Sequence, residues 1–189
     1  MRPERLGKRF LNEEDMNNKI LPNRKNLRLS NYDYKTPGYY FVTICTHNKK
    51  KLFGTVDKLS DMGCIARDEI ERLANKIDCV AVDKYIVMPD HIHAILVVGR
   101  CDNACKASHE VYLNPAECKE LGEIIQLYKA GVSRRIHREI GNDIRVWQRS
   151  YYDVILDTDR KYDNAWYYIE NNPIEEKIRK SEYGFLGDD

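Results

Sequence analysis

Two histidines separated by one residue are the first group in this sequence that could bind a metal ion. His91 and His93 open the run 91–98, in which all the remaining residues are apolar. If this run is a strand, residues i and i+2 face the same side, so both imidazoles project together. Each neutral ring offers one nitrogen lone pair, and Asp90 could orient a ring from behind. His-x-His is also common in proteins where each ring is only hydrogen-bonded or exposed, so the pair alone leaves both interpretations open.

A second candidate group lies near the end of the chain, where Tyr168 and Asn172 are four residues apart. In a helix this spacing places both side chains on one face. A phenol oxygen can attack a phosphate when a metal ion draws charge from that phosphate. An amide oxygen beside two histidine nitrogens would make a mixed, fairly hard site that suits Mg²⁺ or Mn²⁺. The chain has 13 tyrosines, so many of them only pack. The adjacent Tyr167 is a less suitable nucleophile, because only Tyr168 stands four residues before Asn172.

The elements that must position these residues follow from hydrophobic periodicity and turn signals. Aromatic and β-branched runs predict strands at 39–45, 79–87 and 91–98, and the last two form an antiparallel hairpin across a short turn. Helical spacing predicts a helix from near Ser60 or Asp61, another over 121–139 and a final helix over 161–172 that Pro173 stops. A short strand lies within 146–156. The order predicts an α+β, ferredoxin-like βαββαβ sandwich followed by one more helix. That C-terminal helix is the candidate catalytic helix, because it carries Tyr168 and Asn172.

Composition indicates a cytoplasmic protein with one main domain. No apolar run approaches the length of a membrane span, and no apolar segment follows the basic N-terminus as in a secretory signal. We divide the chain into a basic N-terminal extension (1–36), a catalytic domain (37–180) and a polar tail (181–189).

The net charge of +1 argues against binding of nucleic acid by bulk charge, so local basic patches matter more. They could equally be ordinary solvated surface. The side chains that could contact DNA are Arg24, Lys25, Arg28, Lys49, Lys50, Arg134, Arg135 and Arg138.

Four segments in a fixed order resemble a known family. They are YYFVTICT (39–46), VMPDHIH (87–93), WQRSYYD (147–153) and YIENNP (168–173). Together they resemble the Y1 transposases of the IS200-like group, and especially the REP-associated tyrosine transposases. The likeness runs from about residue 31 to about residue 178. The His-hydrophobic-His motif alone is weakly specific, whereas the four segments in order are highly specific.

The resemblance implies an HUH nuclease that cuts and rejoins single-stranded DNA near a hairpin. It implies that His91, His93 and Asn172 bind a divalent metal and that Tyr168 is the nucleophile. It implies a 5′-phosphotyrosyl intermediate and a free 3′-hydroxyl. IS200-like enzymes are typically homodimers, whereas REP-associated relatives can act as monomers, so both states stay open. One departure is Asp157, which stands where relatives usually carry a basic residue.

Other interpretations remain open at this point. The protein could be a domesticated hairpin-binding protein without transposition activity, or a metal-dependent RNA-processing enzyme. Residues 100–118 form an irregular insert between the third predicted strand and the helix over 121–139. Four soft ligands in this insert, Cys101, Cys105, His109 and Cys118, could bind zinc, although their spacing matches no common zinc module.

Overall fold

The computed structural model describes residues 32–77, 79–100, 119–141 and 144–183. The chain divides into two units, Met1–Ser30 and Asn31–Asp189, and every described residue belongs to the second. That unit contains one antiparallel sheet with the strand order β2-β3-β1-β4. Its strands are β1 (Gly38–Cys45), β2 (Cys79–Val87), β3 (His91–Arg100) and β4 (Tyr152–Ile155). The predicted α+β, ferredoxin-like arrangement is confirmed.

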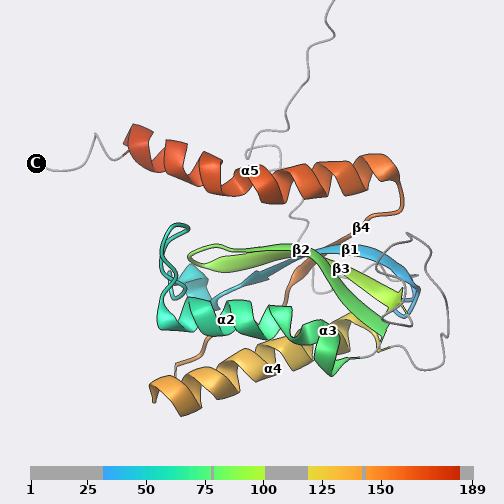
Figure 1. Cartoon of the computed structure of the whole chain (residues 1–189), viewed down its shortest axis with the longest axis horizontal. Coiled ribbons are helices and arrows are strands. Elements are labelled where there is room, and N and C mark those ends of the chain that lie inside the picture. The colour runs from blue at the N-terminus through green and yellow to red at the C-terminus, as the bar shows by residue number, and fades with distance from the viewer. Residues whose placement is uncertain (1–31, 78, 101–118, 142–143, 184–189) are drawn as a thin grey trace, which may run out of the picture. The chain divides into compact units, whose positions relative to one another are not determined.

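Helices cover both faces of this sheet. They are the short 3₁₀ helix η1 (His47–Lys49) and the α-helices α2 (Asp61–Glu71), α3 (Leu73–Lys76), α4 (Leu121–Ile140) and α5 (Asp159–Tyr183). Helices α2, α3 and α4 lie on one side of the sheet, and α5 crosses the other side (Figure 1). No helix among the described residues is long and apolar enough to cross a membrane.

Strict alternation along the strands gives the sheet two different faces. Tyr40, Val42 and Ile44 of β1 are fully buried in the large core beneath α2 and α4, as are Ile92 and Leu96 of β3. The intervening residues face α5 instead. A smaller cluster forms there from Ile95, Leu156, Ala165 and Ile169. Along β3, His91 and His93 alternate with residues of the large core, so the two histidines lie on the α5 side of the sheet.

Local signals set the ends of the two longer helices beneath the sheet. Ser60 caps α2 by accepting a hydrogen bond from the Gly63 amide through its hydroxyl. Glu120 and Glu123 form a capping box at the start of α4. Gly141 ends α4 with a φ of 68°, a left-handed conformation that glycine adopts without steric cost. The predicted start of α2 and both predicted ends of α4 are therefore confirmed to within a residue or two.

The prediction that Pro173 ends the final helix is wrong, because α5 continues to Tyr183 with Pro173 inside it. A proline fixes φ near the helical value and removes only one backbone donor, here the one that would bond to the Ile169 carbonyl. The preceding turns are held on the sheet by Ala165 and Ile169. Packing therefore offsets a local cost of about 3 kcal/mol.

The compact unit also begins earlier than the boundary placed at residue 36. Tyr34 is buried in the large core, and Tyr32 packs against it. The Tyr40 hydroxyl donates to the Thr36 carbonyl and is hydrogen-bonded to Tyr32. Residues 32–36 therefore belong structurally to the body that carries the sheet.

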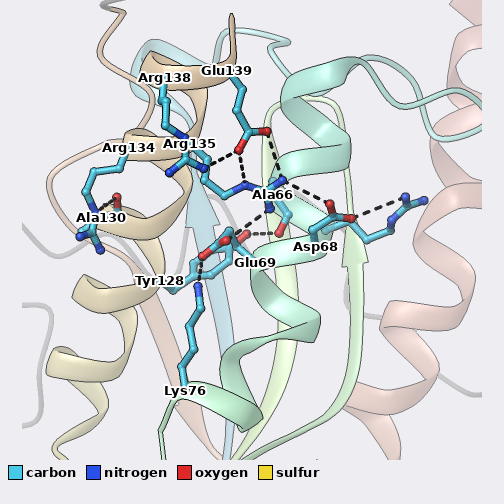
Figure 2. Close-up of polar contacts among 11 residues, drawn as sticks. Ala66, Asp68, Glu69, Lys76, Tyr128, Ala130, Arg134, Arg135, Arg138 and Glu139 are labelled. Carbon is cyan, nitrogen blue, oxygen red and sulfur yellow. Dashed lines mark hydrogen bonds and ion pairs between the residues drawn. The ribbon is translucent and has the colours of Figure 1, made fainter.

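A buried carboxylate joins α2 to α4. Glu69 is 4% exposed and accepts hydrogen bonds from Lys76 at 2.6 Å and from Arg135 at 3.3 Å (Figure 2). Burial raises the pKa of Glu69, but the bonds from Lys76 and Arg135 outweigh it and the pKa is lowered overall. Gly131 of α4 lets the helices approach, since a Cβ there would lie 2.5 Å from the Glu69 Oε2 atom.

We expect Glu69→Gln to lower the free energy of unfolding at pH 7 by about 2 kcal/mol, because charge-assisted hydrogen bonds are lost. A carboxyl group whose pKa is lower in the folded state than in the unfolded state stabilises the protein at pH values above the pKa of the unfolded state. This stabilisation is lost as the pH falls through the pKa of the folded state. The difference between wild type and Glu69→Gln should therefore shrink below about pH 4.5. Urea unfolding at several pH values measures this, and a difference that is constant with pH would contradict it.

Candidate active site

The two histidines of β3 converge on one point. His93 is paired with Thr43 and His91 with Cys45 across the β1–β3 register. Their Nε2 atoms lie 2.9 Å apart, and the ring planes meet at 74°. His93 is 4% exposed, whereas His91 is partly exposed. A distance this short requires either a shared proton or a shared cation between the two nitrogens.

Each ring is held from its far side by a different partner. The Asp90 carboxylate lies 2.6 Å from the His91 Nδ1 atom, and the Thr43 hydroxyl lies 2.9 Å from the His93 Nδ1 atom. A carboxylate only accepts, so His91 donates from Nδ1 and keeps a lone pair on Nε2. In the neutral pair, His93 then donates from Nε2 to His91 and accepts from Thr43. A metal ion bound to both Nε2 atoms would require the other tautomer of His93, which donates to Thr43.

The electrostatics keep His93 neutral and Asp90 charged. Burial, with a further contribution from His91, lowers the pKa of His93 to about 3. For Asp90, burial raises the pKa, but the hydrogen bond from His91 and the charge of Lys49 lower it overall. A neutral imidazole and an ionised neighbour are the protonation states that metal binding needs.

Helix α5 brings Tyr168 to the same place. The Tyr168 ring centroid lies 5.1 Å from that of His93 and 5.9 Å from that of Phe41, edge-on in both cases. Phe41 in turn stacks on His93 at 5.2 Å. The adjacent Tyr167 is 65% exposed on the outer side of the helix. The helix register therefore places Tyr168, and not Tyr167, against the histidines.

Asn172 lies one turn after Tyr168 and is 9% exposed. Within the described part of the chain, no hydrogen bond satisfies its side-chain amide. A buried amide without a partner costs on the order of 1–3 kcal/mol. Its oxygen is therefore a group for which a bound cation would supply the missing partner.

Polar contacts with the edge strand β2, together with the smaller core, hold helix α5 on the sheet. A β-bulge between Val82 and Lys84 interrupts the register of β2. Next to it, Asp83 accepts from the Tyr162 hydroxyl at 2.6 Å. Lys84 lies 3.2 Å from the Trp166 ring centre and is also paired with Glu170. These contacts set the position of the helix that carries Tyr168.

The donor set fits a divalent metal ion. Adjacent ligands of an octahedral ion at about 2.1 Å lie about 3 Å apart, close to the separation of the two Nε2 atoms. Among the described residues, no group of three or more His, Cys, Asp or Glu side chains could hold a metal. A third protein ligand would therefore be the Asn172 amide. The four candidate zinc ligands of the insert lie outside the described residues.

The predicted DNA contacts fall in different places. Lys49 and Lys50 are exposed just after β1, at the end of the sheet that carries His91. Arg134, Arg135 and Arg138 lie on α4, which covers the opposite face (Figure 1). Arg24, Lys25 and Arg28 lie outside the described residues.

Among the described residues, two of these arginines form ion pairs within the chain. Arg135 is paired with Asp68, Glu69 and Glu139 in the contact between α2 and α4 (Figure 2). These ion pairs account for its charge without DNA. Arg138 is also paired with Glu139 but remains largely exposed. Asp157, the acid that departs from the family pattern, forms an ion pair with Lys161 at 2.7 Å.

Thr43 and Phe41 were not predicted from the sequence as site residues. Alternation along β1 shows that they share a face, but not that this face carries the histidines. That knowledge requires the register between β1 and β3, which joins residues 50 positions apart.

Two proteins are similar to this chain over most of its length. No protein-family model matches the chain. A Haemophilus influenzae protein of uncharacterised function is 33% identical over 162 residues, which cover 80% of this chain and 88% of that protein. A second protein of the same organism, whose name assigns it provisionally to the REP-associated tyrosine transposases, is 26% identical over 155 residues and 77% of each chain.

A solved structure supports the same assignment at the level of the fold. It is that of a REP-associated tyrosine transposase bound to a REP hairpin, with a TM-score of 0.54 at 14% identity, and the match covers 79% of this chain and 73% of that one. The four ordered segments, the named relative and the fold point to one likeness: this chain is similar to the REP-associated tyrosine transposases of the IS200-like group.

Proposed function

We propose that this chain is a metal-dependent endonuclease and strand transferase that acts on single-stranded DNA beside a hairpin through a 5′-phosphotyrosine intermediate. The observation that carries the proposal is the convergence of His91 and His93 of β3 with Tyr168 of α5, where the buried Asn172 follows Tyr168 by one helical turn. We include the hairpin because the REP-associated tyrosine transposase that shares this fold is bound to a REP hairpin in its structure.

The chemistry is a pair of transesterifications. The Tyr168 oxygen attacks the phosphorus, the bond to the 3′ oxygen breaks, and the 3′-hydroxyl leaves with a proton. A 3′-hydroxyl from the same or another strand then attacks the phosphotyrosine and releases Tyr168. Each step exchanges one phosphodiester for another, so no external energy source is needed.

The residues of this chain have separate tasks in that scheme. His91, His93 and Asn172 would hold a divalent ion, Mg²⁺ or Mn²⁺, which draws charge from the phosphate and favours the phenolate. Phe41 and the packing of α5 keep the Tyr168 ring beside His93. His91, His93 and Tyr168 meet within one chain, so the proposed chemistry does not call for residues of a second copy.

The proposal is tested with a DNA hairpin that carries single-stranded arms. The full chain is incubated with this DNA and Mn²⁺, and the products are separated by denaturing electrophoresis. A covalent protein–DNA adduct that requires the metal is the expected result. DNA binding without an adduct would instead favour a hairpin-binding protein, and an adduct formed in the presence of a chelator would refute the metal role. Adduct formation on an RNA hairpin but not on the DNA would indicate an RNA-processing enzyme.

Thr43 provides a prediction about metal binding alone. Thr43→Val keeps the shape of the side chain but removes the group that accepts from the metal-bound tautomer of His93. We expect Mn²⁺ affinity to fall roughly 10-fold, which is the lower end of the range seen when a metal ligand loses its hydrogen-bond partner. Thr43→Ser, which keeps the hydroxyl, should bind as wild type. Isothermal titration calorimetry measures both, and equal affinities for the valine and serine variants would contradict this role.

A further inference from the structure

Two exposed apolar side chains of β4 lie beside the candidate active site. Tyr152 is 46% exposed and Val154 is 49% exposed. Within the described residues, the Tyr152 hydroxyl has no hydrogen bond and its ring has no contact with another aromatic ring. A tyrosine so exposed on a sheet face, with no side-chain partner among the residues that the structure describes, is available to a ligand.

Tyr152 and Val154 form an exposed strip on β4, and the register of the sheet relates this strip to the histidines. Tyr152 is paired with Thr43, and Thr43 is paired with His93 on its other side. In the next row, Val154 is paired with Phe41. Paired residues share a face, so Tyr152 and Val154 point to the side that carries Tyr168. Two strand spacings place Tyr152 roughly 10 Å from His93 across the sheet.

Helix α5 leaves this strip open. Its main contacts are with β2 and β3, and its aromatic contacts reach Tyr39 and Phe41 of β1. Neither Tyr152 nor Val154 belongs to the smaller core that α5 covers. The site side of the sheet is therefore covered over β2 and β3 and open over β4.

Basic groups lie at the end of this strip that is nearer to His91. The Gln148 amide donates to the Cys45 carbonyl, which brings the segment before β4 next to the end of β1. Arg149 is exposed there, and Lys49 and Lys50 are exposed in the turn after β1. This arrangement suits a polyanion whose backbone passes the histidines while its apolar parts face the sheet.

We propose that Tyr152 and Val154 form a platform on which one or two unpaired bases of the substrate strand stack while the scissile phosphate lies at His91, His93 and Tyr168. The proposal rests on the proposed function and adds a binding subsite for the nucleotides beside the cleaved bond. The separation from His93 is one that the sugar and base next to that phosphate can span. A platform of two side chains is too small for a stable protein partner, which needs about 800 Å² on each side.

The test compares non-covalent affinities in a Tyr168→Phe background, so that no adduct forms. The probe is a fluorescein-labelled DNA hairpin with unpaired arms of mixed sequence, followed by fluorescence anisotropy with Mn²⁺ present. Tyr152→Ala is expected to weaken binding roughly 5- to 100-fold, whereas Tyr152→Phe keeps the ring and binds as the background does. Leu127→Ala is the matched control, since Leu127 is 43% exposed on α4 across the sheet.

Abasic substitutions locate the stacked base. Removing one base in an arm should weaken binding by the same factor as Tyr152→Ala, and combining both changes should weaken it no further. Affinity unchanged by Tyr152→Ala would overturn the platform, as would equal losses in Tyr152→Ala and Leu127→Ala. A change of oligomeric state in Tyr152→Ala, seen by size exclusion without loss of affinity, would also overturn it, in favour of an interface between copies.

These outcomes are separable from failure of the proposed function. With Tyr168 intact, Tyr152→Ala should need roughly 5- to 100-fold more DNA than wild type to form the same amount of covalent adduct, because the platform binds the strand and does not touch the phosphate. If wild type forms the adduct and Tyr152→Ala binds normally, only the platform fails. If wild type forms no adduct at any DNA concentration, the catalytic proposal fails, and the anisotropy still reports on the platform.

Discussion

Tyr168→Phe is expected to abolish covalent attachment to DNA, with a loss of at least about 10³-fold, as found when the nucleophile of a covalent enzyme is removed. Phenylalanine keeps the ring that packs against His93 and Phe41 but lacks the attacking oxygen. The fold and the metal ligands should be unaffected. The measurement is the rate of adduct formation on a hairpin DNA with Mn²⁺, read by denaturing electrophoresis.

The adjacent tyrosine is the control for this experiment. Tyr167 has the same chemistry but is 65% exposed on the other side of α5. Tyr167→Phe should therefore form the adduct at the wild-type rate. Loss of the adduct in Tyr167→Phe with normal adduct formation in Tyr168→Phe would mean that Tyr167, and not Tyr168, faces the histidines in the reacting protein.

His93→Ala should produce the second large effect, a loss of Mn²⁺ affinity of about 100-fold or more, since it removes a ligand and not only a partner behind one. Burial lowers the pKa of His93 to about 3, so protons do not compete with the metal for this ring at neutral pH. Adduct formation should fall with the affinity and recover partly at high Mn²⁺. Calorimetry and the adduct assay measure the two effects.

His137 offers a matched control for loss of an imidazole. It is exposed on α4, and its ring is hydrogen-bonded to the Ile144 carbonyl. His137→Ala should bind Mn²⁺ as wild type does. Circular dichroism of His93→Ala separates loss of a ligand from loss of the fold. Unchanged metal affinity in a folded His93→Ala protein would exclude His93 as a ligand.

Much of the fold was predictable because its signals are local. The alternation in β1 and β3, the cap at Ser60 and the glycine at Gly141 each depend on a few neighbouring residues. Pro173 misled the prediction because a proline in a helix costs one hydrogen bond, whereas packing of the preceding turns on the sheet decides whether the helix continues. Sequence periodicity does not measure that packing.

The site was predictable where residues share an element, and not where they meet across elements. The i, i+2 spacing of His91 and His93 predicts a common face, and the four-residue spacing of Tyr168 and Asn172 predicts another. Thr43 reaches His93 only through strand register. Arg135 was read as a solvated or DNA-binding residue, yet one of its partners, Glu69, lies 66 positions away on another helix. Contacts of this kind follow from tertiary packing, which a single sequence does not reveal.

The central claim is that the Tyr168 oxygen becomes joined to a DNA phosphate. Trypsin cleavage after Lys161 and Lys177 releases residues 162–177, a peptide that contains Tyr162, Tyr167 and Tyr168. After adduct formation with Mn²⁺ and digestion of the DNA, tandem mass spectrometry of this peptide locates the attached nucleotide. We predict that every fragment containing Tyr168 carries the added mass and that fragments ending at Tyr167 do not. A nucleotide on Tyr167 or Tyr162, or on any other peptide, would contradict the account.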